Sequence, residues 1–108
     1  MADSVKTFFS ELAGNVDASK TAGMNATFQF VVTGDDGGEW YAKIADGGVD
    51  IGAGKADNPT ITLTSSAADF LDLVNGKING QTAFLTGKLK IQGDMTLAMK
   101  LESVFALG

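Results

Sequence analysis

The chain has 108 residues, which suits a single domain over residues 1–108 with one modest core. It contains no cysteine, histidine or arginine, so disulfides, zinc–thiolate sites, histidine general bases and bidentate guanidinium clamps are excluded. Its formal net charge of −5 argues against nucleic-acid binding and allows at most transient membrane contact, because phosphate groups would repel the chain as a whole.

The first half of the chain predicts one helix followed by a meander of three antiparallel strands. Within the helix, apolar residues recur at i, i+3, i+4 and i+7, which places them on one face. The strands alternate, with Phe28 and Phe30 on one face of the first strand and Trp40 on one face of the second. The expected elements are a helix over residues 4–13 and strands over residues 26–33, 39–46 and 49–51.

The second half predicts two further strands and two or three helices. Ser66 and Asp69 are spaced like a capping box at the start of a helix. After the short helical turn that Gly87 ends, alternation directs Leu89 and Ile91 inward. The expected elements are strands over residues 60–64 and 88–92, a helix over residues 67–75, a helical turn over residues 81–86 and a final helix that Asp94 caps.

This order of elements predicts the fold class. The sheet has one hydrophobic face, which helices must cover. The sequence therefore predicts an α+β fold of two layers, in which helices cover one face of a five-stranded, mostly antiparallel sheet.

Motifs for catalysis, metals and cofactors are absent or incomplete. A phosphate loop that ends at Gly54-Lys55 would need glycine in place of Val49 and Ser or Thr in place of Ala56. Asp35, Asp36 and Glu39 lack calcium-loop spacing and suit a solvated turn. We therefore expect no catalytic residue, no metal site and no cofactor, and a binding protein rather than an enzyme.

The final helix carries more apolar residues than one surface face requires. Its main stripe includes Leu97, Leu101 and Phe105, while Met95 and Met99 fall outside that stripe. Two interpretations stay open from the residues alone. These methionines either pack as plain core under another helix or contact an irregular apolar partner, for which a polarisable side chain is well suited.

Residues 56–101 closely resemble the sterol carrier protein 2 family. The specific segments are TITL with DFL shortly after it, then NGKIN, then AFLTGKLKIQGDM, then LAMKL, all at the family's offsets. Residues 5–51 follow the family order of helix, strand, glycine turn and tryptophan-containing strand more loosely. The resemblance implies an apolar tunnel between the layers, and non-catalytic binding of long-chain fatty acids, fatty acyl-CoA, sterols or phospholipids.

The resemblance also suggests which side chains contact the lipid. It implies that the final helix lies against the tunnel, so that Met95 and Met99 help to line it. The candidate lipid-binding residues are Phe8, Phe9, Leu12, Phe28, Phe30, Trp40, Ile61, Leu63, Phe70, Leu73, Val74, Phe84, Ile91, Met95, Met99 and Phe105.

An alternative role is an accessory or scaffold subunit that presents substrate to a lipid-metabolising enzyme, because the family's domain also occurs joined to enzymes. For location, the sequence favours the cytoplasm. The N-terminus lacks a secretory n-region, and the last residues do not form the small-basic-leucine peroxisomal signal of some family members.

Overall fold

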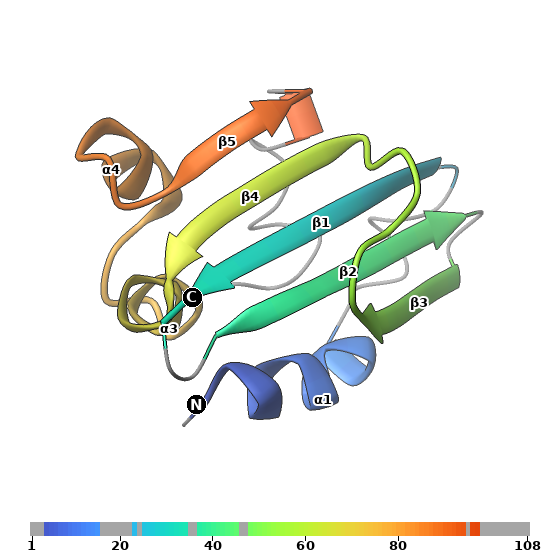
Figure 1. Ribbon diagram of the computed structural model, residues 1–108, viewed down its shortest axis with the longest axis horizontal. Helices are drawn as coiled ribbons and strands as arrows, with labels where there is room; N and C mark the ends of the chain where they lie inside the picture. Colours follow the sequence, from blue (N-terminus) through green and yellow to red (C-terminus); the bar gives the residue numbers. More distant parts are fainter. Residues whose placement is uncertain are drawn as a thin grey trace.

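A computed structural model describes residues 4–15, 23, 25–34, 37–45, 48–94 and 96–97. Its helices and strands follow the predicted order (Figure 1). They are α1 (Val5–Asn15), β1 (Asn25–Thr33), β2 (Gly38–Ala45), β3 (Gly48–Ala53), β4 (Ile61–Ser66), α3 (Ala67–Val74), α4 (Gly80–Leu85) and β5 (Lys90–Gly93).

The five strands form one sheet in the order β3-β2-β1-β4-β5. The pairs β1–β2, β2–β3 and β4–β5 are antiparallel, while β1 and β4 are parallel. The predicted five-stranded, mostly antiparallel sheet is therefore confirmed. Because β3 and β4 are not neighbours, the chain between them must cross two strands. Figure 1 shows this segment, residues 54–60, passing over β2 and β1.

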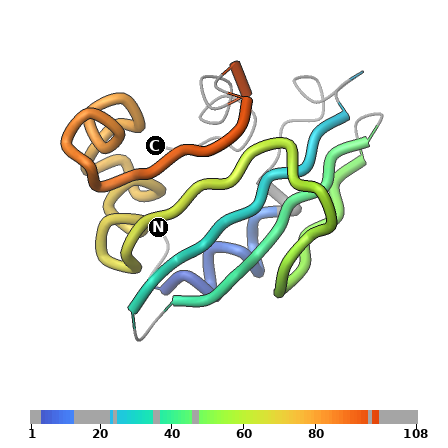
Figure 2. The backbone as a smooth tube through the Cα atoms, turned by 45° about the horizontal axis from the view of Figure 1, so that its top comes forward, coloured from blue at the N-terminus to red at the C-terminus, as the bar shows by residue number. Residues whose placement is uncertain are grey.

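One face of the sheet is apolar and carries the helices. Along β1, Phe28, Phe30 and Val32 are buried, as the alternation predicted. Ala42 of β2 and Ile61 and Leu63 of β4, which pair with Phe28 and Phe30, are buried on the same face. In Figure 2, α1 lies behind the sheet and residues 54–60 cross in front of it. The helices and the crossing segment thus lie on opposite faces.

Side-chain caps start the later helices. The hydroxyl of Ser66 accepts from the Asp69 N–H at 3.2 Å, which confirms the predicted cap of α3. Asn79 caps α4 in the same way. Asp94 Oδ1 accepts from the Thr96 N–H at 2.9 Å, so the final helix begins where the sequence predicted. Met95 and residues 98–108 lie outside the described residues, and so do the other predictions made for this helix.

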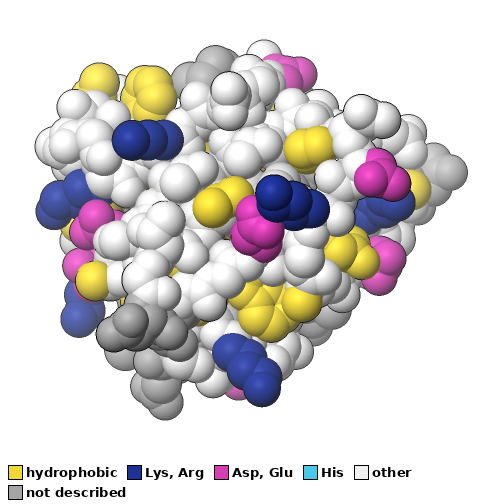
Figure 3. Space-filling view, in the orientation of Figure 1, with side chains coloured by type: hydrophobic (Ala, Val, Ile, Leu, Met, Phe, Trp, Pro, Cys, Tyr) yellow, Lys and Arg dark blue, Asp and Glu magenta, His cyan; other side chains and the backbone are white. Residues whose placement is uncertain are grey.

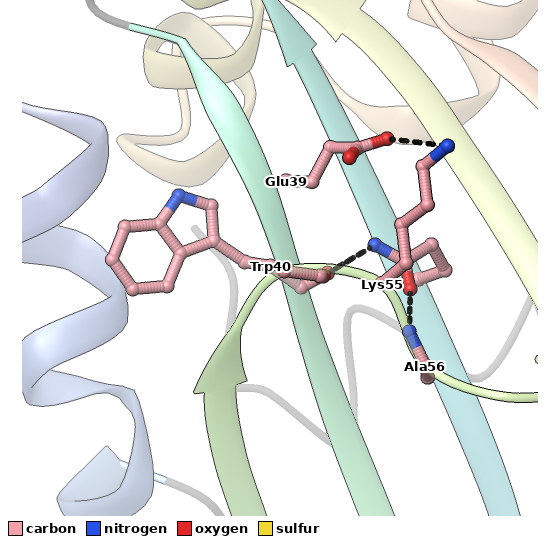
Figure 4. A network of polar contacts seen from close by, with 6 residues as sticks. Glu39, Trp40, Lys55 and Ala56 are labelled. Carbon is pink, nitrogen blue, oxygen red and sulfur yellow. Dashed lines mark hydrogen bonds and ion pairs between the residues drawn. The ribbon is translucent and has the colours of Figure 1, made fainter.

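The opposite face holds a buried amide. Gln29, which is 5% exposed, donates from Nε2 to the carbonyl oxygens of Trp40 at 3.0 Å and Gly54 at 3.1 Å. Its Oε1 accepts from the Ala56 N–H at 2.7 Å. Figure 4 shows this network, together with the surface ion pair between Lys55 and Glu39. One side chain therefore fixes the crossing segment to the sheet.

None of the helices in the described part of the chain has the length and apolar character needed to span a bilayer.

Candidate functional site

The apolar layer between the helices and the sheet is the candidate site. We call it the interlayer core and define it as the described hydrophobic side chains that are buried there. Those residues are Val5, Phe9, Leu12, Ala26, Phe28, Phe30, Val32, Ala42, Ile44, Ile61, Leu63, Phe70, Leu73, Ala83 and Leu89.

An aromatic cluster centred on Phe9 of α1 joins four elements of the fold. The Phe9 ring stacks on Trp40 of β2, with centroids 4.9 Å apart and planes 10° apart. It also stacks on Phe70 of α3 at 5.6 Å and lies 5.2 Å from Phe30 of β1. Phe8 meets both Phe9 and Phe70 edge-on. Such stacked and edge-to-face pairs each contribute about 0.5–1.5 kcal/mol beyond the burial of their area.

The indole of Trp40 and its backbone carbonyl interact with groups on opposite faces of the sheet. Its indole lies on the α1 side of β2, while its backbone carbonyl accepts the hydrogen bond from Gln29. Figure 4 shows Lys55 and Ala56 on the other side of the strand from the indole. Trp40 is half-buried. A lipid in the interlayer core near α1 would therefore lie close to the only tryptophan in the chain.

The other part of the interlayer core is aliphatic. Ile61 and Leu63 of β4, Leu73 of α3 and Ala83 of α4 are all buried there. Leu97, in the first turn of the final helix, is partly buried against the interlayer core. Leu89 is buried immediately before β5. Other partly buried aliphatic side chains that pack against the core are Val49, Ile51, Ala67, Leu71, Val74, Ile78 and Ile91.

Polar groups are nearly absent from the interlayer core. Among the described residues, the buried polar side chains are those of Gln29 and Ser65. Gln29 belongs to the opposite face, because it bonds to the crossing segment. Ser65 pairs with Val32 and is the one polar side chain of the helical face among them. Such a layer suits a hydrocarbon and would penalise an unpaired charge by several kcal/mol.

Comparison with protein families identifies the fold and the class of protein. The sequence matches the SCP-2 sterol transfer family over residues 7–106, which is nearly the whole chain. The chain belongs to the SCP-2 sterol transfer family. Membership in this family supports lipid binding or transfer as the general function, and it confirms the family to which the sequence motifs pointed.

Solved structures and curated sequences agree with SCP-2 membership. Sterol carrier protein 2 from Yarrowia lipolytica, in its apo form, is 26% identical with a TM-score of 0.79, over 97% of this chain and 93% of that one. Palmitated SCP2L2 from Aedes aegypti is 26% identical with a TM-score of 0.71, over 94% of each chain. Hydroxysteroid dehydrogenase-like protein 2 from Bos taurus is 40% identical over 80 residues, which are 73% of this chain.

The SCP-2 chain described here is much shorter than its curated relatives. It spans only 19% of the bovine protein and 21% of the Xenopus tropicalis protein of the same name. The activities of those whole proteins are therefore not carried over to this domain.

The structure brings most of the candidate lipid-binding residues of this SCP-2 domain together. Those that are buried in the interlayer core are Phe9, Leu12, Phe28, Phe30, Ile61, Leu63, Phe70 and Leu73. Those that are partly buried against it are Phe8, Trp40, Val74 and Ile91. Phe84 is 40% exposed and lies outside the core. Met95, Met99 and Phe105 lie outside the described residues, so their contact with lipid stays a prediction.

Sequence reasoning did not identify two features near the site. Ala83, rather than Phe84, is the residue through which α4 enters the core. The small side chain gave no hydrophobic signal. Gln29 was also missed, because an amide on the outer face of a strand is ordinary until the path of residues 54–60 is known. Neither feature has a local sequence signature.

Proposed function

We propose that this chain binds a lipid with a long hydrocarbon chain between its helical layer and its sheet, and transfers that lipid without catalysing a reaction. The observation that carries the proposal is the size of the interlayer core, together with the finding that Ser65 is the one buried polar side chain on the helical face among the described residues. SCP-2 membership and the palmitated relative support the same class of ligand. We expect fatty acids and fatty acyl-CoA as ligands, with sterols and phospholipids as further candidates.

The energetics favour broad selectivity. Burial of apolar area contributes about 25 cal/mol per Å², or about 0.8 kcal/mol per methylene, so a long acyl chain offers on the order of 10 kcal/mol before ordering costs. Neighbouring chain lengths differ by only about 1–3 kcal/mol in such a site. The hydrocarbon therefore sets the affinity, and we expect similar binding of related lipids.

Lys88 and Lys90 are not assigned to the lipid head group. Lys90 pairs with Thr64, on the face of the sheet away from the neighbouring Leu63–Ile91 pair. Lys88 and Lys90 are both exposed. A head group at the mouth of the proposed site would therefore have to be solvated by water or by other groups.

Displacement of a fluorescent fatty acid from delipidated protein tests the proposal. Palmitate, palmitoyl-CoA and cholesterol serve as competitors. We expect saturable binding at one site, in the micromolar range or tighter, as about 8 kcal/mol of net binding free energy would give. The order of the competitors would identify the lipid class. Absence of binding up to the solubility limit of the lipids would contradict the proposal.

A second candidate function follows from the size of the relatives. Hydroxysteroid dehydrogenase-like protein 2 contains a matching segment that is about a fifth of its length. The chain could therefore act as an accessory or scaffold unit of a lipid-metabolising enzyme, with the interlayer core as ordinary packing. Stable co-purification with an enzyme, without bound lipid, would favour this function over the carrier.

The cytoplasmic location expected from the sequence stays a prediction. Fractionation of cells that express the native protein would test it.

A further inference from the structure

The surface at the tip of α4 differs from the rest of the described molecule. Phe84 is 40% exposed and Leu85 is 73% exposed, and these neighbours are the exposed large hydrophobic side chains among the described residues. Figure 3 shows hydrophobic side chains beside lysine at the end of the molecule where Figure 1 places α4. We call Phe84, Leu85 and the exposed lysines Lys77, Lys88 and Lys90 the α4 tip.

The geometry of α4 keeps Phe84 and Leu85 outside. Ala83 is 1% exposed and anchors the helix to the interlayer core. Successive helical residues are turned by 100°, so Phe84 and Leu85 rotate progressively away from the buried side of Ala83. Ala83 is the buried residue of α4, so Phe84 and Leu85 cannot share the buried side of the helix. Their exposure is therefore built into the fold.

The turns before and after α4 each end on a lysine. After α4, Gly87 adopts a φ of 80°, and the Lys88 N–H donates to the Ala83 carbonyl at 2.8 Å. After α3, Gly76 adopts a φ of 78°, and the Lys77 N–H donates to the Asp72 carbonyl at 2.8 Å. Both are Schellman turns, which glycine permits because it lacks a Cβ. Each turn places a lysine directly after the C-terminus of a helix.

The charge of this region is opposite to that of the rest of the chain. Residues 73–93 contain three lysines, Lys77, Lys88 and Lys90, and no acid, although Asp72 and Asp94 directly flank this segment. The remaining residues contain five lysines and 13 acids, so local charges of +3 and −8 sum to the net −5. All three lysines are exposed, and none forms an ion pair with another residue in the part of the chain that the structure describes.

We propose that the α4 tip is the surface by which this protein binds anionic lipid membranes. Phe84 and Leu85 would enter the boundary between head groups and acyl chains, and the three lysines would contact head-group phosphates and carboxylates. The inference rests on the proposed function, because it assigns the lipid carrier its membrane-contacting surface. Two protruding apolar side chains among cations suit a bilayer, which combines apolar and anionic groups within a few ångströms.

A protein partner fits these observations less well. A stable protein interface buries about 800 Å² on each partner and has a well-packed apolar centre. The described α4 tip offers two apolar side chains on a six-residue helix instead. A symmetric dimer formed through the α4 tip would also bring the lysines of the two copies together, and these like charges would repel.

Flotation with vesicles tests the inference. Phosphatidylcholine vesicles with and without phosphatidylserine are compared at low salt and at about 1 M salt, where the screening length falls to about 3 Å. We expect binding to the anionic vesicles at low salt only. Replacement of the three lysines in K77Q/K88Q/K90Q should weaken binding on the order of 100-fold, since each lysine near an anionic surface contributes about fivefold. F84Q/L85Q should weaken it by about tenfold or more.

A matched control carries the same change of charge elsewhere. Lys6, Lys43 and Lys55 are the other described lysines, and all three are exposed. K6Q/K43Q/K55Q removes as many positive charges as the α4-tip variant, and should weaken binding by about threefold or less because these sites lie away from the bilayer. Equal losses in the two triple variants would overturn the inference. So would undiminished binding of F84Q/L85Q, or failure of the unaltered protein to bind anionic vesicles at low salt.

Displacement of fluorescent fatty acid without vesicles separates this inference from the proposed function. We expect both triple lysine variants to bind fatty acid like the unaltered protein, because none of these lysines lies in the interlayer core or among the candidate lipid-binding residues. Vesicle binding through the α4 tip without fatty-acid binding would sustain the inference and refute the carrier. If sedimentation showed instead that F84Q/L85Q abolishes a dimer and leaves vesicle binding intact, the inference would be overturned.

Discussion

α1 and α4 belong to the same side of the molecule, yet they place phenylalanine in opposite environments. Phe9 of α1 is enclosed by the rings of four other aromatic residues, whereas Phe84 of α4 is substantially exposed beside Leu85. α1 has 11 residues, so it can present an apolar stripe along the sheet, and α4 has six. Helix length and anchoring, rather than residue type, therefore decide which apolar side chains belong to the interior.

The largest expected effect comes from Phe9→Ala. Removal of a buried ring at the centre of the aromatic cluster should lower the free energy of unfolding by about 3–5 kcal/mol. Urea unfolding followed by circular dichroism would measure the change. Phe84→Ala is the matched control, with the same substitution on another helix, and should cost about 1 kcal/mol or less because that ring is only partly buried. Equal costs for both variants would refute the contrast between α1 and α4.

The next largest loss of stability is expected on the opposite face of the sheet, at the buried amide of Gln29. Gln29→Leu should destabilise the protein by about 2–4 kcal/mol, because it leaves the Ala56 N–H and two carbonyl oxygens without their partner. Exposed Gln81 of α4 is the matched control, and Gln81→Leu should change stability by about 0.5 kcal/mol or less. Proteolysis between β3 and β4 should accelerate in the Gln29 variant alone. Unchanged stability would mean that Gln29 does not fix the crossing segment.

A smaller effect is expected at the start of α3, the helix that carries Phe70 to the aromatic cluster. Ser66→Ala removes the side-chain cap and should cost about 1 kcal/mol. Ser10 is an exposed serine inside α1 whose hydroxyl donates to the Lys6 carbonyl. Ser10→Ala should be neutral or slightly stabilising, because such back-bonding competes with the helix. Thermal unfolding of both variants checks the order. A costlier Ser10 substitution would contradict it.

The local features of the fold were predictable from the sequence. Alternation identified the buried face of β1 at Phe28 and Phe30, and the capping residues Ser66 and Asp94 were evident because capping acts within three residues. The parallel pairing of β1 with β4 was not predicted. That pairing joins Phe28 to Ile61 across 33 positions, and no short pattern encodes it.

The sequence predicted most of the apolar residues of the candidate site, but not which residue of α4 is buried there. Phe9, Phe30 and Phe70 were expected on inward faces, and the structure packs them together. Phe84 was named with them as a candidate lipid-binding residue, whereas its neighbour Ala83 occupies the buried position. Such a choice between adjacent residues depends on how a short helix is docked, which tertiary packing determines.

Quenching of Trp40 emission by palmitate that carries bromine on its acyl chain tests the central claim most directly. The chain has a single tryptophan, and its indole stacks on Phe9 within the aromatic cluster. If lipid enters between the helices and the sheet, quenching should be saturable and unlabelled palmitate should reverse it. Saturable binding of the labelled palmitate that leaves Trp40 emission unchanged would place the lipid elsewhere and contradict the account.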